Sequence, residues 1–188
     1  LCRRSGLRRV MVGVESGSQE MLDRVRKDAR LDQVVATAES LVRHDVGATF
    51  SFIVGFPGES DASVQQTLDL IKRLRGMSGR FDTPIFYYKP YPGSELSREA
   101  ARRGYRLPET LGAWASFDYV NSSGPWVEDD KRQLIERFKF YSRFAWGGGG
   151  GRRWPLRAVA RWRCRRDEYR LPWEKLLAER LKPEPRLS

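Results

Sequence analysis

The sequence predicts an α/β fold of parallel strands and helices, followed by a basic and mostly helical C-terminal extension. Residues 49–54 form an apolar or strand-prone run without polar alternation, which is typical of a strand covered on both faces in a parallel sheet. The predicted elements alternate as strand, helix, strand, helix, strand up to Pro90, and this order favours parallel pairing. Residues 151–188 contain twelve Lys and Arg against five Asp and Glu, so much of the net charge of +11 lies in the extension.

The composition is that of a folded globular protein. The 188 residues are 40% hydrophobic and 12% aromatic, which is enough for a core and argues against a disordered chain. Cys2 and Cys164 match no zinc or redox spacing, so they predict no metal site and no disulfide framework, and they favour a reducing compartment. No apolar run reaches membrane-spanning length, and the N-terminus does not resemble a signal peptide. We therefore expect a cytoplasmic protein.

The first strand is expected at residues 9–14 and leads into Glu15-Ser-Gly-Ser18. Ser18 can cap a short helix that turns Met21, Leu22 and Val25 inward. A second helix is predicted because apolar residues recur at helical spacing before Gly47, namely at Leu31, Val34, Val35, Ala38, Leu41 and Val42.

The strand at 49–54 runs into the turn Gly55-Phe-Pro-Gly-Glu59. Ligands of parallel sheets and barrels bind at the carboxyl ends of the strands, and a glycine there lets a ligand approach the main chain closely. Ser60 or Asp61 is expected to cap a third helix, and residues 84–90 read as another strand. The inward residues of the third helix are expected to be Val64, Leu68, Ile71 and Leu74.

The pattern changes after Leu96. Residues 97–146 are predicted to be an aromatic-rich wrapping segment and a helix, residues 147–151 a glycine hinge, and residues 152–188 a basic amphipathic tail. A short helix is expected at 98–103, and a longer one begins at Asp129 or Asp130. Its inward residues are expected to be Leu134, Ile135, Phe138, Tyr141 and Ala145.

Three ordered stretches carry a family resemblance: RVMVGVESGS at 9–18 followed by Lys27, FIVGFPGE at 52–59, and YYKPYPGSEL at 87–96. Together they resemble the later strands of the radical S-adenosylmethionine (SAM) barrel. The sequences of the motifs are most similar to those of its cobalamin-dependent members. Residues 162–174 are similar, more loosely, to tails of that subgroup. The resemblance implies that residues 1–96 are the C-terminal half of a TIM-like (β/α) barrel.

The resemblance also implies a SAM site. Glu15 would accept hydrogen bonds from the ribose or the ammonium group of SAM, and Lys27 would neutralise its carboxylate. Glu59 stands one place after the position of the glutamate in the family's strand motif, so it is not assigned a SAM contact. The expected SAM-binding residues are Glu15, Ser16, Lys27, Ile53, Gly55, Tyr88 and Pro90, the last four on the adenine side.

The implied cofactors are SAM and a 4Fe-4S cluster, with cobalamin as a further candidate. Three cysteines in a CxxxCxxC motif bind the cluster in this family, and the sequence lacks that motif. We therefore expect the cluster ligands and any cobalamin domain to lie outside this chain, which alone would be inactive. The expected partner is the missing N-terminal half of the barrel or its upstream domain. A degenerate barrel that only binds is the alternative.

The substrate stays open between a small molecule, a lipid or tetrapyrrole, and RNA. Arg and Trp interleave at 152–154 and 161–166, a pattern typical of nucleic-acid binding. With Trp154, Trp162 and Trp173 the same tail also suits an anionic membrane surface, and Leu156, Val159, Ala160 and Arg163 would share one helical face. Nucleic acid is the less favoured partner, because the charge follows the glycine hinge. An RNA-modifying methylthiotransferase and a non-catalytic basic module remain the alternatives.

Overall fold

The computed structural model describes residues 3–115, 124–146, 154–170 and 172–174. These residues fall into two compact units, Leu1–Arg132 and Gln133–Ser188, which are described separately. The predicted glycine hinge at 147–151 lies outside the described residues, and the predicted segment boundaries stay predictions.

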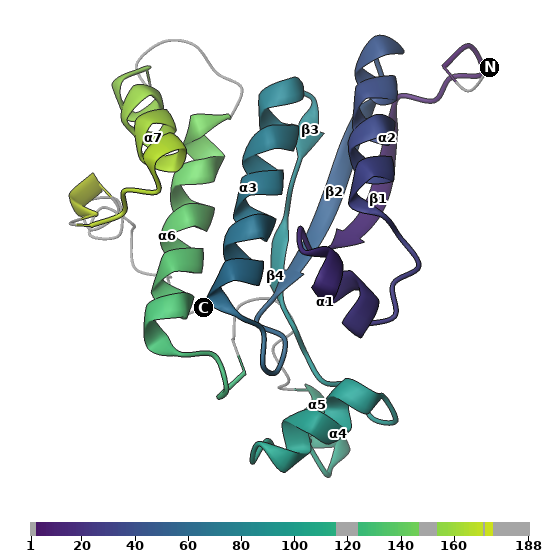
Figure 1. Ribbon diagram of the computed structural model, residues 1–188, viewed down its shortest axis with the longest axis vertical. Coiled ribbons are helices and arrows are strands. Elements are labelled where there is room, and N and C mark those ends of the chain that lie inside the picture. The colour runs from purple at the N-terminus through teal and green to yellow at the C-terminus, as the bar shows by residue number, and fades with distance from the viewer. Residues whose placement is uncertain (1–2, 116–123, 147–153, 171, 175–188) are drawn as a thin grey trace. The chain divides into compact units, whose positions relative to one another are not determined.

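A parallel sheet organises the first unit (Figure 1). Its central strand is β2 (Gly47–Val54), which pairs with β1 (Arg9–Glu15) on one side. On the other side β2 pairs with β3 (Phe81–Asp82) and then with β4 (Ile85–Tyr87). All three pairings are parallel, as the order of predicted elements indicated, and the described strands form an open sheet.

The strand predicted at 84–90 is shorter than expected, and a second short strand, β3, precedes it in the chain. Thr83 and Pro84 separate β3 from β4, although both pair with the same edge of β2. Proline has no N–H to donate, so it interrupts a ladder, yet the Pro84 carbonyl still accepts from the Phe52 amide at 3.0 Å. The two short strands therefore act as one interrupted edge.

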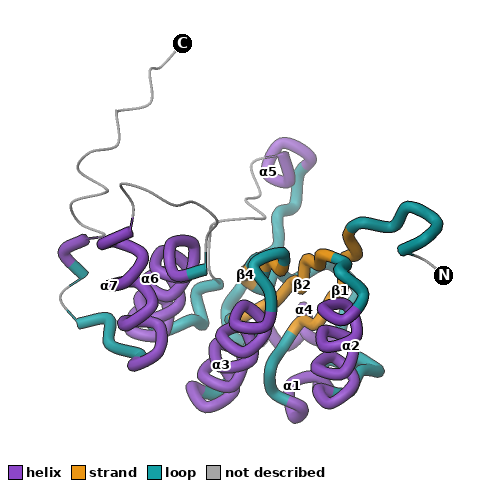
Figure 2. Tube along the Cα trace, turned by 90° about the horizontal axis from the view of Figure 1, so that it is seen from above, coloured by secondary structure: helices purple, strands orange, loops and turns teal. Residues whose placement is uncertain are grey.

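Helices α2 (Leu31–Arg43) and α3 (Asp61–Met77) cover one face of the sheet (Figure 2). The Ser60 hydroxyl caps α3 by accepting from the Ser63 amide at 3.1 Å, and the four predicted inward residues of α3 are fully buried. In α2 the buried residues are Val34 and Ala38, whereas Val42 is 42% exposed. The apolar face of α2 is therefore narrower than the sequence indicated.

The prediction that the central strand is covered on both faces is wrong. Along β2 the residues alternate, with Phe50, Phe52 and Val54 buried beneath the helices and Thr49, Ser51 and Ile53 only partly covered. Met11 of β1 is 79% exposed. The face of the sheet opposite α2 and α3 is thus open in this chain.

Shorter helices surround the strand ends. Helix α1 (Gln19–Arg24) follows β1, and its N-cap residue Ser18 makes no side-chain capping bond. Helix α4 (Glu95–Arg102) begins before the predicted residue 98, because the Ser94 hydroxyl caps it by accepting from the Ser97 amide. Helix α5 (Leu111–Ala115) lies within the segment predicted to be aromatic-rich and wrapping, where no helix was expected.

The second unit contains most of α6 (Asp129–Ala145) and all of α7 (Trp154–Arg166). Helix α6 begins at one of the two predicted aspartates, and four of its five predicted inward residues are buried. In α7 the buried residues are Ala160, Arg163 and Cys164, whereas Val159 is 37% exposed. The predicted shared face of α7 is therefore only partly correct.

A buried guanidinium group ties the second unit together. Arg163 forms an ion pair with Glu174 at 3.0 Å and donates to the carbonyls of Glu168 and Arg170. Its guanidinium also lies 5.2 Å from the centre of the Tyr141 ring. Tyr141 in turn donates to Glu174 at 2.8 Å. Arg163 is thus a buried structural residue, whereas Arg161, Arg165 and Arg166 of the same helix are exposed.

Among the described residues, none of the helices combines the length and the hydrophobicity that crossing a bilayer requires.

Candidate functional site

A pocket of about 470 Å³ lies at the carboxyl ends of β1, β2 and β4, on the open face of the sheet. This is the end of a parallel sheet at which ligands bind in barrels and open α/β folds. Its lining residues come from three strands, from the loops after β2 and β4, and from the segment that follows α1: Glu15, Val25, Arg26, Lys27, Ser51, Ile53, Phe56, Phe86, Tyr87, Tyr88, Lys89 and Tyr91.

Glu15 and Lys27 form the polar side of the pocket. Lys27 Nζ lies 3.2 Å from Glu15 Oε1, and both side chains are partly exposed. Glu15 has a φ of 68°, an uncommon value for a residue other than glycine, and such strain is concentrated at functional sites. An amino-acid ligand, which carries both an ammonium and a carboxylate, could exchange partners with this pair.

The end of β1 is shaped so that Glu15 can face Lys27. The register between β1 and β2 shifts between Gly13 and Glu15, as in a β-bulge, which redirects side chains at a strand end. A Cβ atom on Gly13 would lie 2.5 Å from Glu15 Oε1 and 3.4 Å from Lys27 Nζ. The glycine therefore leaves the space into which the carboxylate folds.

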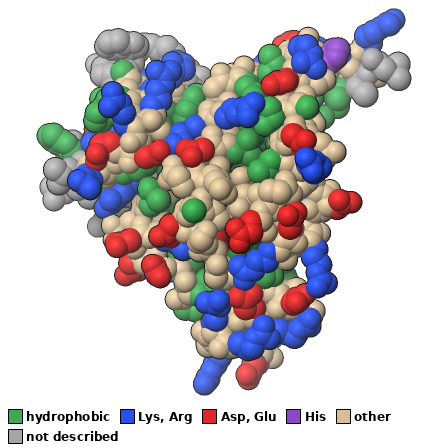
Figure 3. Space-filling view, viewed as in Figure 1, with side chains coloured by type: hydrophobic (Ala, Val, Ile, Leu, Met, Phe, Trp, Pro, Cys, Tyr) green, Lys and Arg blue, Asp and Glu red, His purple; other side chains and the backbone are tan. Residues whose placement is uncertain are grey.

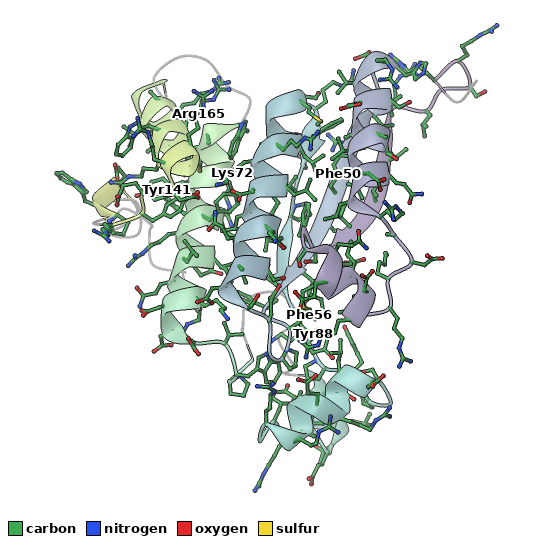
Figure 4. The ribbon with its side chains drawn as sticks, viewed as in Figure 1. Phe50, Phe56, Lys72, Tyr88, Tyr141 and Arg165 are labelled. Carbon is green, nitrogen blue, oxygen red and sulfur yellow. The ribbon has the colours of Figure 1, made fainter. Side chains whose placement is uncertain are left out.

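Aromatic and aliphatic side chains form the opposite wall. The rings of Phe56 and Tyr88 lie 5.0 Å apart, and Figure 4 shows them side by side at the strand ends. Met21 completes a buried cluster with these two rings, and Ile53 packs against it. Burial raises the pKa of the Tyr88 hydroxyl. This wall is suited to a flat, weakly polar group such as a nucleobase.

The turn after β2 is held by protein groups. Glu59 is 5% exposed, and its carboxylate accepts from the amides of Gly55 at 2.6 Å and Phe56 at 3.3 Å. Burial raises the pKa of the Glu59 carboxyl, although these hydrogen bonds oppose the shift. The Gly55 carbonyl accepts from Trp126 Nε1 at 2.8 Å. The Gly55 amide and carbonyl are therefore both used inside the protein.

Gly55 itself is required by the backbone. Its φ is 74°, and a Cβ atom would lie 2.9 Å from Val127 and 3.3 Å from the Tyr87 ring. The close approach that the sequence suggested for a ligand is thus made by Val127 and Tyr87.

The structure brings together four of the seven predicted SAM-binding residues. Glu15, Lys27, Ile53 and Tyr88 line the pocket, whereas Ser16, Gly55 and Pro90 do not line it. Ser16 is fully buried, and its hydroxyl lies 3.2 Å from that of Thr67 and accepts from the Ser18 amide. Its position thus fits a role in joining the end of β1 to α3. SAM binding by the seven residues stays a prediction.

Sequence reasoning missed several lining residues. Ser51 and Phe86 could have been found, since each lies two positions before a predicted site residue and therefore on the same side of its strand. Arg26, Lys89 and Tyr91 follow from no strand periodicity, because they lie in loops. With Lys27 they give the pocket a rim in which cations outnumber Glu15, the carboxylate among its lining residues.

The described residues contain no group of three His, Cys, Asp or Glu side chains placed to hold a metal ion. The whole sequence has two cysteines, fewer than the three thiolates that a radical SAM cluster takes from its protein. These residues therefore do not fit a 4Fe-4S cluster, while the pocket fits an organic ligand with charged and flat parts.

Residues 1–71 match the Radical SAM superfamily. Over 128 residues, 66% of this chain, the sequence is 36% identical to tRNA-2-methylthio-N(6)-dimethylallyladenosine synthase of Frankia alni. It is 35% identical over 105 residues to the synthase of the same name from Paracoccus denitrificans, covering 54% of this chain. It is 33% identical over 89 residues, 46% of this chain, to threonylcarbamoyladenosine tRNA methylthiotransferase MtaB of Thermotoga maritima.

The chain spans 24%, 21% and 20% of the length of these three relatives. The relatives are methylthiotransferases rather than cobalamin-dependent enzymes. The resemblance of the motifs to the cobalamin-dependent subgroup is therefore not supported. The comparisons therefore support the radical SAM superfamily as the family that the N-terminal part of this chain resembles.

Proposed function

We propose that this chain supplies SAM-binding strands to a radical SAM enzyme of the methylthiotransferase type that modifies RNA. The observation that carries the proposal is the pocket in which Glu15 and Lys27 face an aromatic and aliphatic wall at the ends of parallel strands. Most of these residues lie within the segment that matches the superfamily. The relatives' names supply the reaction type.

In this proposal different residues bind different parts of SAM. Lys27 would bind the carboxylate of SAM, and Glu15 would accept from its ammonium group or ribose hydroxyls. Ile53 and Tyr88 would pack against adenine, because both line the pocket and belong to its apolar and aromatic side. Glu59 would keep the turn after β2 in one conformation while the ligand binds, since its carboxylate fixes two consecutive amides.

In such an enzyme a 4Fe-4S cluster would supply the electron that cleaves SAM into methionine and a 5′-deoxyadenosyl radical, a step that the residues of this chain do not perform. The cluster ligands would come from outside these residues, because the sequence holds only two cysteines. The role of this chain is then to bind and orient SAM. A barrel that binds SAM without catalysis would have the same pocket and remains the second candidate.

RNA is favoured over a lipid or a tetrapyrrole for two reasons. The relatives named above act on tRNA by their names. The pocket rim also carries three cations, Arg26, Lys27 and Lys89, against two carboxylates, Glu15 beside Lys27 and Glu95 beside Arg26, and this excess of positive charge suits a substrate that carries phosphates.

The test is equilibrium binding of SAM to the 188-residue chain and to Glu15→Gln and Lys27→Met variants. Each substitution removes a charge-assisted hydrogen bond of about 1.5–3 kcal/mol, so we expect affinity to fall about 10- to 100-fold. Glu20→Gln is the matched control, because Glu20 is an exposed carboxylate on the neighbouring helix α1.

Equal affinity of wild type and both site variants would refute the assigned SAM site. Anaerobic reconstitution with iron and sulfide tests the cluster separately. A stoichiometric 4Fe-4S spectrum with SAM cleavage by this chain alone would show that its own residues hold the cluster, contrary to the proposal.

A further inference from the structure

The outward side of α7 carries a row of arginines. Arg157, Arg161 and Arg165 are spaced by four residues, so they lie above one another on one side of the helix. At 1.5 Å per residue the row is about 12 Å long. With Arg166, Ala158 and Trp162 these residues line a hollow of about 580 Å³. We call Arg157, Arg161, Trp162, Arg165 and Arg166 the arginine face of α7.

These arginines differ from the buried arginine of the same helix. Arg163 is neutralised by Glu174 inside the second unit. In the part of the chain that the structure describes, no carboxylate forms a salt bridge with the four arginines of the arginine face. Figure 3 shows Lys and Arg side chains on the visible surface over α7. A row of unneutralised guanidinium groups attracts a polyanion.

The packing of α7 distinguishes between two kinds of anionic partner. An interfacial membrane helix inserts a broad apolar face into the bilayer. In α7 the apolar residues Ala160 and Cys164 are buried within the second unit, and its exposed residues include Arg161, Arg165 and Arg166 beside Val159 and Trp162. Trp162 is 53% exposed among the arginines, and an indole ring can stack on an unpaired base. The arrangement therefore favours a nucleic acid over a lipid surface.

We propose that the arginine face of α7 binds the phosphate backbone of RNA, with Trp162 as a stacking residue. The choice of RNA rests on the proposed function, whereas the choice of a polyanion rests on the arginine face itself. Arginine is well suited to this role, because its planar fork binds phosphate oxygens in pairs. The surface would hold the substrate without taking part in the chemistry.

The test compares binding of unfractionated tRNA to the 188-residue chain and to a triple variant, Arg157→Gln, Arg165→Gln, Arg166→Gln. Arg161 stays in place because its Nε donates to the Ala145 carbonyl at 2.9 Å, which stabilises the unit. Each lost phosphate contact lowers the slope of log affinity against log salt by about 0.7–0.9. We expect the slope to fall by about 2 and affinity at 0.1 M salt to fall at least about tenfold.

Two further variants control for net charge and for folding. Arg43→Gln, Arg102→Gln, Arg106→Gln removes three exposed charges from the first unit and should leave affinity nearly unchanged. Replacing Arg157, Arg165 and Arg166 by Lys retains the charge and should preserve most of the salt dependence.

The stacking role of Trp162 is tested separately. Trp162→Ala should weaken binding to single-stranded RNA more than to duplex RNA.

Equal losses in the two Gln variants, or no loss in either, would overturn the proposal. So would an α7 variant that loses binding only to vesicles containing anionic phospholipid. SAM binding is measured on the same samples. Absence of SAM binding would count against the proposed function. RNA affinity that is unchanged by the α7 substitutions would count against this inference alone.

Discussion

Glu59 holds the turn beside the pocket although its side chain does not line the pocket. Its carboxylate lies beneath the turn after β2, where it accepts from two backbone amides, and Ser63 donates to it at 3.5 Å. Its own carbonyl accepts from Lys131 at 2.7 Å. A buried carboxylate with several donors is retained for geometry, because its desolvation opposes ionisation.

Replacing Glu59 by Gln should change how stability depends on pH. Burial raises the folded-state pKa of Glu59 above its ordinary value of 4.5, so the native state binds the proton more tightly than the unfolded chain. That contribution is complete below pH 4.5 and is lost as pH rises through the raised pKa. We expect the free energy of unfolding of Glu59→Gln to improve relative to wild type as pH increases.

Urea unfolding between about pH 4 and pH 8 measures this difference, which amounts to about 1.4 kcal/mol for each unit of pKa shift. Glu39→Gln, an exposed substitution on α2, is the control. Parallel stability curves for wild type and Glu59→Gln would show that Glu59 does not titrate abnormally.

Among the elements, β1 is the one whose local shape decides the site. A regular strand would continue its alternation past Gly13, but the register shift before Glu15 and the positive φ of Glu15 turn the carboxylate toward Lys27. The helices contribute differently. Burial of α2 and α3 against one face leaves the other face of the same strands free to line the pocket.

Gly13→Ala should weaken SAM binding about tenfold with little change in thermal stability. The added methyl group would meet the end of the flexible Glu15 side chain rather than backbone, so the carboxylate would move while the strand keeps its pairing. Calorimetry and a SAM titration check the two parts. Gly76→Ala in α3 is the control, because a Cβ atom there meets nothing within 4 Å. Unchanged SAM affinity in Gly13→Ala would contradict the role given to the Glu15 position.

On the scale of the whole molecule, the chain consists of two units whose stability rests on different interactions. The first unit has an aliphatic and aromatic core between sheet and helices. The second has an ionic centre, in which Arg163, Glu174 and Tyr141 bind one another. Burial and the hydrogen bond to Glu174 raise the pKa of the Tyr141 hydroxyl, so it stays a donor at neutral pH.

Arg163→Leu should destabilise the second unit by about 3 kcal/mol, because it leaves the Glu174 carboxylate without its cation and two carbonyls without their donor. Hydrogen exchange read by mass spectrometry should then be faster in α6 and α7 and unchanged in β1 and β2. Arg165→Leu, on the exposed side of the same helix, is the matched control. Equal acceleration of exchange in the sheet would show that the two units open together.

Local pattern was enough to predict much of the fold. The parallel order of the strands, the start and the inward side of α3, and most of the inward side of α6 were predicted from spacing, because periodicity and capping act over a few residues. Glu15 and Lys27 were expected beside one cavity and do lie together, because only a short helix and its loops separate them in the sequence, whereas their contacts with SAM stay predictions.

What the tertiary structure decided was which predicted residues reach the pocket. Gly55 lies at the expected strand end, but Trp126, 71 positions later, takes its carbonyl and Val127 occupies the space beside it. Ser16 follows Glu15 directly, yet the turn of the backbone sends its hydroxyl to Thr67. No local pattern contains these partners, because they are brought together only when distant segments pack. The sequence alone determined most of the elements and the chemistry available at the strand ends, and long-range packing determined which of those side chains line the pocket.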